Sequence, residues 1–188
     1  MKKSFFYILF LLLATSSFGQ SNEEYWDRWN TNYPEVDMIS VLKQERAYAD
    51  SIENKPKMIQ YYVGPANKYR FDAEYLGETR DVSKEVFSSM KRVFKLRLGD
   101  PKQLDGLVEK EVLFKVGQEK IWMPIQPKVL EYLEEEVEKG NIITLYCILF
   151  TEHSAKGELY NTFFISEFSQ YKDDDFFIEE NRFNGQKE

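Results

Sequence analysis

The stretch from Glu111 to Phe168, EVLFKVGQEKIWMPIQPKVLEYLEEEVEKGNIITLYCILFTEHSAKGELYNTFFISEF, decides the fold of this chain. Residues 111–116 and 120–126 are rich in β-forming side chains, which predicts two strands. Gly117-Gln118-Glu119 between them has the length of a hairpin loop, with a glycine where a positive backbone angle is wanted. The first part of the stretch therefore predicts a β-hairpin.

The rest of the stretch predicts a helix and two more strands. Pro127 suits a first helical turn and Gly140 suits a helix end, and an apolar stripe lies between them. Residues 142–150 are apolar at both parities apart from Thr144, so this strand should be covered on both faces. We expect Cys147 in this strand to be a buried small hydrophobe. A last strand is expected at residues 159–168.

The loop expected between these two strands carries the only histidine of the chain, His153, beside Glu152 and Ser154. Members of a catalytic triad meet through the fold, so their adjacency in sequence is no sign of one. We interpret the three residues as solvent-exposed loop residues.

Two helices and two strands are expected before this stretch. Apolar residues recur at three and four over residues 37–54, which predicts a helix. Residues 57–63 and 69–75 have the character of strands and surround the turn Gly64-Pro65, so a hairpin is expected. A further helix is predicted over residues 82–96, capped by Asp81 or Ser83.

These elements predict an α+β fold, an antiparallel sheet of about six strands with three helices. The order strand, strand, helix, strand, strand resembles the later part of an OB-type barrel, where a helix lies between the third and fourth strands. Such a barrel would need residues 69–76 as its first strand, and the helix at 82–96 departs from that plan. An open sheet with helices on one face fits the same order.

The N-terminus has the pattern of a secretory signal peptide. Lys2 and Lys3 precede an apolar run at residues 5–14, and small or polar residues lead to a cleavage site between Gly19 and Gln20. This apolar run is about half the length of a membrane-spanning helix, and no longer apolar run follows it in the sequence. We expect export to the periplasm or the extracellular space, with no transmembrane segment left after cleavage.

The expected organisation is a signal peptide at 1–19, an aromatic arm at 20–36, one α+β domain at 37–170 and an acidic tail at 171–188. Without Lys2 and Lys3, 23 of the 25 basic residues remain against 32 acidic ones, a net charge of −9. This balance argues against nucleic acid as a partner, because binding to phosphates depends on clustered Lys and Arg.

Catalytic and metal-binding signatures are scarce. One cysteine cannot form an intrachain disulfide, and a single His and a single Cys do not make a usual zinc site. No Gly-rich phosphate loop is present, and the acidic tail lacks the spacing of a calcium-binding loop. We therefore predict no cofactor and no metal, and catalytic residues are not identifiable.

Two groups of side chains are candidate binding residues. Aromatic rings at Tyr25, Trp26, Trp29 and Trp122 could hold a sugar ring or a partner protein, although burial against the domain explains them as well. Cations gather near the end of the helix at 82–96, where they could bind an acidic partner or simply interact with helix carbonyls: Lys91, Arg92, Lys95 and Arg97.

The resulting hypothesis is an exported, non-catalytic protein that binds another protein or a cell-envelope component. Two alternatives from other classes remain open. One is a carbohydrate-active hydrolase with an Asp/Glu pair, whose two carboxylates need only be set apart by the fold. The other is a small-ligand carrier with an aromatic-lined pocket.

Overall fold

The computed structural model describes residues 22–53, 62–153 and 157–170. The expected signal peptide with its cleavage site and the expected acidic tail lie outside the described residues. The described residues belong to two units, one ending at Asn32 and one beginning at Tyr33. The first contains helix α1 (Asn22–Asn32), and the second contains all the other elements.

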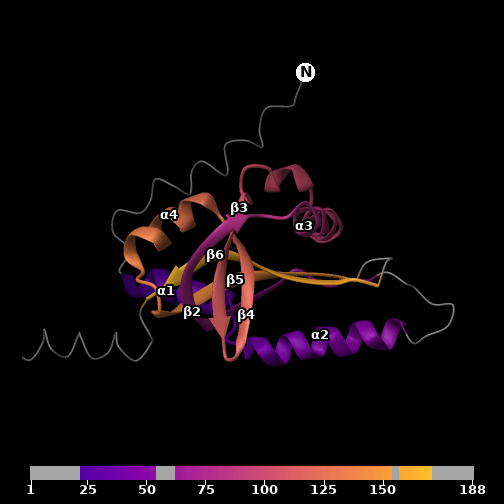
Figure 1. The fold of residues 1–188 in the computed structure, drawn as a ribbon, viewed down its shortest axis with the longest axis horizontal. Helices are drawn as coiled ribbons and strands as arrows, with labels where there is room; N and C mark the ends of the chain where they lie inside the picture. Colours follow the sequence, from indigo (N-terminus) through magenta and orange to yellow (C-terminus); the bar gives the residue numbers. More distant parts are fainter. Residues whose placement is uncertain (1–21, 54–61, 154–156, 171–188) are drawn as a thin grey trace, which may run out of the picture. The chain divides into compact units, whose positions relative to one another are not determined.

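The unit that begins at Tyr33 is an α+β domain (Figure 1). Its helices are α2 (Met38–Glu53), α3 (Lys84–Arg97), the 3-10 helix η1 (Pro101–Leu104) and α4 (Pro127–Glu136). Its strands are β1 (Tyr62–Val63), β2 (Asn67–Asp81), β3 (Lys110–Val116), β4 (Glu119–Ile125), β5 (Ile142–His153) and β6 (Leu159–Ser169). The α+β class and the order of elements after residue 111 are confirmed.

Five of the strands close into a barrel in the order β5, β2, β3, β4, β6 and back to β5, with β1 as an extra strand. The expectation of a purely antiparallel sheet is wrong, because β4 and β6 pair in parallel at Ile125 and Ile165. Closure removes the exposed edges that an open sheet would leave. The structure is therefore a closed mixed barrel.

The predicted hairpin of residues 57–63 with 69–75 is also wrong. Tyr62 and Val63 pair with His153 and Glu152 at the end of β5, and residues 57–61 lie outside the described part of the chain. β5 is long enough to pair with β2 through Ile142–Leu149 and still offer its last residues to β1. The length of β5 thus decides where β1 is placed.

Apolar side chains fill the barrel interior. Residues on one side of each barrel strand point inward, and Val129 and Leu133 of α4 and Val137 just after it join them in the core. The largest buried side chains inside include Phe114, Phe163, Leu145 and Met123. The predicted apolar stripe of α4 is therefore confirmed, and it packs against the barrel.

A second apolar cluster lies on the outer side of β5 and β6. Phe150 and Phe164 from the two strands pack with Met90 and Val93 of α3, and Val63 of β1 joins them. Figure 1 shows α3 and α2 on opposite sides of the extended end of the β5–β6 hairpin. Ser83 caps α3 as predicted, its side chain accepting a hydrogen bond from the Val86 amide.

Cys147 lies in the middle of β5 and is completely buried, as predicted. Burial raises the pKa of its thiol well above the ordinary value, so almost no thiolate forms near neutral pH. We expect the native protein not to react with a thiol-directed chromogenic disulfide at mildly alkaline pH, and to react fully once unfolded in guanidinium. Rapid reaction of the native protein would contradict the buried placement.

Candidate functional site

The side of β2, β3 and β4 that faces away from the barrel interior is a candidate binding surface. Val112 and Phe114 of β3 point into the core, so alternation places Glu111, Leu113 and Lys115 on the outer face. Pro124, Trp122 and Lys120 of β4 lie directly opposite these three residues. The principal helix contacts of the barrel fall on β5 and β6 instead. We call this surface the outer face.

Arg80, Glu111 and Trp122 form a stack on the outer face. Arg80 of β2 lies opposite Glu111, and its Nε donates a hydrogen bond of 2.8 Å to Glu111 Oε2. The guanidinium also lies over the Trp122 ring, 4.2 Å from the ring centroid. The Glu111 side chain is only 2% exposed, whereas that of Arg80 is 47% exposed. The carboxylate and the indole therefore hold a half-exposed guanidinium in one orientation.

Two lysines extend this surface toward the β3–β4 turn. Lys115 Nζ lies 3.0 Å from Glu74 Oε2 of β2, and both side chains are partly exposed. The exposed Lys120 faces Lys115 across the strand pair. Such a like-charge pair is unfavourable by itself, and Glu74 offsets part of this cost. Arg80 and Lys115 are thus each paired with a carboxylate on the outer face.

Trp122 was predicted as a ligand-binding residue from its residue type alone. The structure shows that its ring contacts the Arg80 guanidinium. Arg80 covers one side of the indole, so the exposed polar group here is the guanidinium. Arg80 and Glu111 were missed by sequence reasoning. Their adjacency depends on the register of β2 and β3, which shifts between Tyr75 and Thr79.

Three of the four cations in the predicted acidic-partner patch contact other parts of the domain. Lys91 Nζ lies 2.6 Å from Asp105 Oδ1, and Arg92 forms a two-bonded ion pair with Glu152. Arg97 donates hydrogen bonds to the carbonyl oxygens of Val63 and Gly64. Lys95 is exposed on the same helix. The patch thus contributes to attaching α3 to the sheet.

The end of β5 carries three consecutive buried polar residues, Thr151, Glu152 and His153. The interpretation of Glu152 and His153 as exposed loop residues is wrong, because β5 continues to His153 and both are at most 2% exposed. Ser154 lies outside the described residues. Each buried side chain has a polar partner on another element: Asn161 for Thr151, Arg92 for Glu152 and Glu53 for His153.

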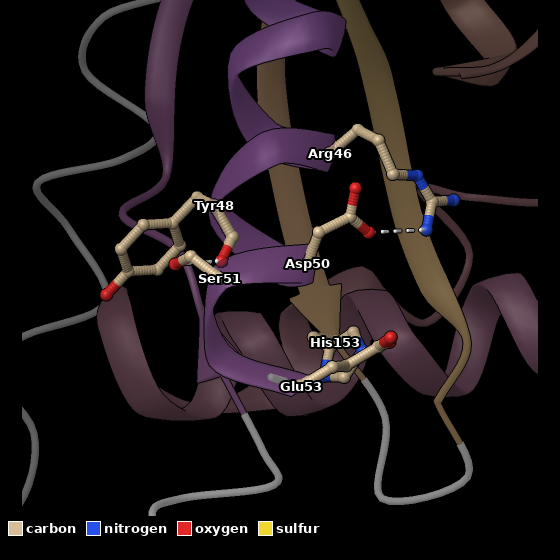
Figure 2. A network of polar contacts seen from close by, with 6 residues as sticks. All are labelled: Arg46, Tyr48, Asp50, Ser51, Glu53 and His153. Carbon is tan, nitrogen blue, oxygen red and sulfur yellow. Dashed lines mark hydrogen bonds and ion pairs between the residues drawn. The ribbon is translucent and has the colours of Figure 1, made fainter. Parts of the chain in front are cut away.

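His153 and Glu53 are the most enzyme-like pair in the described residues, and Figure 2 shows them where the last turn of α2 meets β5. His153 Nε2 lies 2.5 Å from Glu53 Oε1, and His153 Nδ1 is buried without a hydrogen-bond partner in the described part of the chain. A general acid or base must reach the proton of a substrate. Because His153 is nearly inaccessible, the pair is better explained as a contact between α2 and β5.

Glu45 of α2 has a buried Oε2 with no hydrogen-bond partner among the described residues, and desolvation raises the pKa of this carboxyl. The folded state therefore binds this proton more tightly than the unfolded chain. Its contribution to stability falls as the pH rises from the ordinary Glu range through the raised folded pKa. We expect Glu45→Gln to become more stabilising, relative to the wild type, from about pH 4 to neutral pH. Urea unfolding at both pH values measures this trend, and an unchanged difference would contradict it.

The predicted aromatic residues of the N-terminal arm lie in α1. The Tyr25 ring packs edge-on against Trp26, with the centroids 5.0 Å apart, and lies 6.3 Å from the Trp29 ring. The three rings thus form one cluster on this helix. The rings lie on a helix, and the binding role of the cluster stays a prediction.

The described residues contain no group of three or more His, Cys, Asp or Glu side chains that could hold a metal ion. They also contain no helix that is long and apolar enough to cross a membrane. Comparison of the chain with protein-family models, with curated proteins and with solved structures found no match.

Proposed function

We propose that this protein is an exported, non-catalytic binding protein that uses an OB-type barrel to bind a component of the cell envelope. Export rests on the signal-peptide pattern of residues 1–19. The barrel supports the OB-type assignment by the way its strands are connected. When only the barrel strands are counted in chain order, the first strand (β2) pairs with the second (β3) and the fourth (β5). The third strand (β4) is parallel to the fifth (β6), and α4 lies between the third and fourth strands.

The observation that carries the proposal is the position of the outer face within this barrel. OB-type barrels bind chain-like ligands on the face of their second and third strands, which here are β3 and β4. The described barrel interior is filled by side chains such as Phe114 and Phe163. This filling favours binding at the surface over carriage of a small ligand inside. The insertion of α3 and η1 between the first two strands departs from the simplest OB-type plan.

Binding through the outer face can be tested with the mature chain, residues 20–188, immobilised and incubated with cell-envelope extract with and without cross-linking. We expect an envelope component to be retained by the wild type and by Lys43→Glu, which changes an exposed residue of α2. We expect less retention by Lys120→Glu, which reverses a charge on the outer face. If nothing is retained even after cross-linking, the proposed function is wrong.

A further inference from the structure

Two leucines at the end of α3 are exposed, although the apolar face of this helix is already buried. Met90 and Val93 of α3 are completely buried in the second apolar cluster. Leu96 and Leu98 follow them and are 60% and 49% exposed, and Leu96 is the most exposed large apolar side chain among the described residues. A single exposed leucine is common on protein surfaces, whereas neighbouring ones often mark an interaction site. The fold thus leaves apolar area uncovered at this helix end.

The two leucines belong to the connection between α3 and η1, and we call residues 95–102 the α3–η1 turn. The amides of Leu98 and Gly99 both donate hydrogen bonds to the Phe94 carbonyl oxygen, which ends the helix. Residues 95–100 are all exposed, and a side-chain carbon added at Gly99 would have no other atom within 4 Å. The turn is therefore open to solvent, and it suits a broad surface better than a small ligand that needs a pocket.

The α3–η1 turn is positively charged in an otherwise acidic chain. Its sequence, KLRLGDPK, contains three cations and only Asp100 as an acid, a net charge of +2, whereas the expected mature chain has a net charge of −9. Arg97 donates to two backbone carbonyl oxygens, which carry no net charge and leave its own charge uncompensated. Among the described residues, no carboxylate forms an ion pair with Lys95, Arg97 or Lys102. The exposed leucines are thus surrounded by cations.

This combination favours a lipid surface over the other possible partners. Interaction with helix carbonyls explains cations at a helix end, but it does not explain exposed leucines beside them. The centre of a protein–protein interface is usually poor in lysine. At a membrane surface, apolar side chains enter the boundary between headgroups and acyl chains while Lys and Arg contact lipid phosphates. Both features of the turn are used only in this last case.

We infer that the α3–η1 turn docks on a membrane surface that contains anionic lipids, with Leu96 and Leu98 inserted among the headgroups and Lys95 and Lys102 facing the lipid phosphates. The inference goes beyond the proposed function, because α3 packs on β5 and β6 and the turn is not part of the outer face. The ion pair of Arg92 with Glu152 holds α3 on the sheet. Because the helix is already fixed, docking costs little conformational entropy.

The test is co-sedimentation of residues 20–188 with vesicles of phosphatidylglycerol and phosphatidylethanolamine, and with vesicles of phosphatidylcholine alone. This chain keeps every described element and lacks the apolar run of residues 5–14, which would itself bind lipid. We expect binding to the anionic vesicles only, weakened by NaCl. Lys95→Gln/Lys102→Gln should weaken it at least about tenfold through the lost charges. Leu96→Gln/Leu98→Gln should weaken it by a similar factor through the lost apolar insertion.

Two matched controls alter the same residue types elsewhere: Ile142→Gln, whose side chain is 57% exposed at the start of β5, and Lys43→Gln on α2. Both should bind anionic vesicles like the wild type, and circular dichroism should show that all variants are folded. An equal loss in the controls, or equal binding to phosphatidylcholine, would contradict docking by the turn.

Failure of this inference is distinguishable from failure of the proposed function. If no vesicle is bound while envelope extract is retained and Lys120→Glu lowers this retention, membrane docking is wrong and the proposed function stands. If the leucine variant binds vesicles normally but no longer retains a purified envelope protein, the partner of the turn is a protein and membrane docking is wrong. Vesicle binding that only the α3–η1 turn variants lose supports the inference, whatever the outer face binds.

Discussion

Arg92→Ala is expected to lower the free energy of unfolding by about 2–3 kcal/mol, because it removes an ion-pair partner of the fully buried Glu152 carboxylate. The cost stays below that of breaking a pair buried on both sides, because the Arg92 side chain is 46% exposed. Glu152 points from β5 toward α3 and accepts hydrogen bonds from Arg92 Nε and Nη2 at 2.5 and 2.6 Å. Because the Glu152 side chain is completely buried, the charge that remains in the variant is costly. Urea unfolding followed by circular dichroism measures the loss.

Two further variants separate this effect from a general cost of removing an arginine. Arg46→Ala breaks an exposed pair with Asp50 at 3.9 Å on α2 and should cost less than about 1 kcal/mol. The double variant Arg92→Leu/Glu152→Met removes both charges and should recover most of the lost stability. A cost below about 1 kcal/mol for Arg92→Ala would mean that the ion pair is not needed to keep Glu152 buried.

Phe114→Ala is expected to cost about 3–5 kcal/mol, because a large side chain would be removed from the centre of the filled barrel. Phe114 of β3 is fully buried, and its ring centroid lies 5.7 Å from that of Tyr75 on β2. The barrel is closed by pairings on every side, so its walls can collapse only partly around the cavity.

The matched control for this second variant is Leu96→Ala on α3, whose side chain is 60% exposed. It should change the unfolding free energy by less than about 0.5 kcal/mol, as most surface substitutions do. Thermal or urea unfolding of the two variants side by side makes the comparison. Equal costs at both positions would contradict the placement of Phe114 in the barrel interior.

The pattern of short-range signals predicted most elements of this domain. Apolar spacing and turn residues place α2, α3, β3, β4 and β6 close to their observed bounds, and Cys147 was correctly predicted to be buried. The predicted helix end at Gly140 is wrong, because α4 ends at Glu136, and β5 continues to His153 instead of ending at residue 150. These features depend on residues within a few positions of each other, where periodicity and capping act. Gly117 at the β3–β4 turn has a φ of 60°, as its place in the loop predicted.

The candidate site was harder to predict because it depends on register. Trp122 was identified by its type, but its partners Arg80 and Glu111 come from two other strands. A register shift in β2 decides which residue lies opposite Glu111. The basic cluster on α3 was predicted from the sequence. Glu152, the buried acid that forms an ion pair with Arg92, was interpreted as a loop residue.

The sequence by itself determined most of the elements, the apolar faces that pack and the absence of an intrachain disulfide, because each of these follows from composition or local spacing. The tertiary structure alone decided the closed barrel, through the parallel pairing of Ile125 with Ile165, and the pairing of β1 with β5. It also decided that Glu152 and His153 are buried, since their partners Arg92 and Glu53 lie 60 and 100 positions away. Most buried polar groups in proteins have such a partner, and a partner far away along the chain cannot be identified from local sequence.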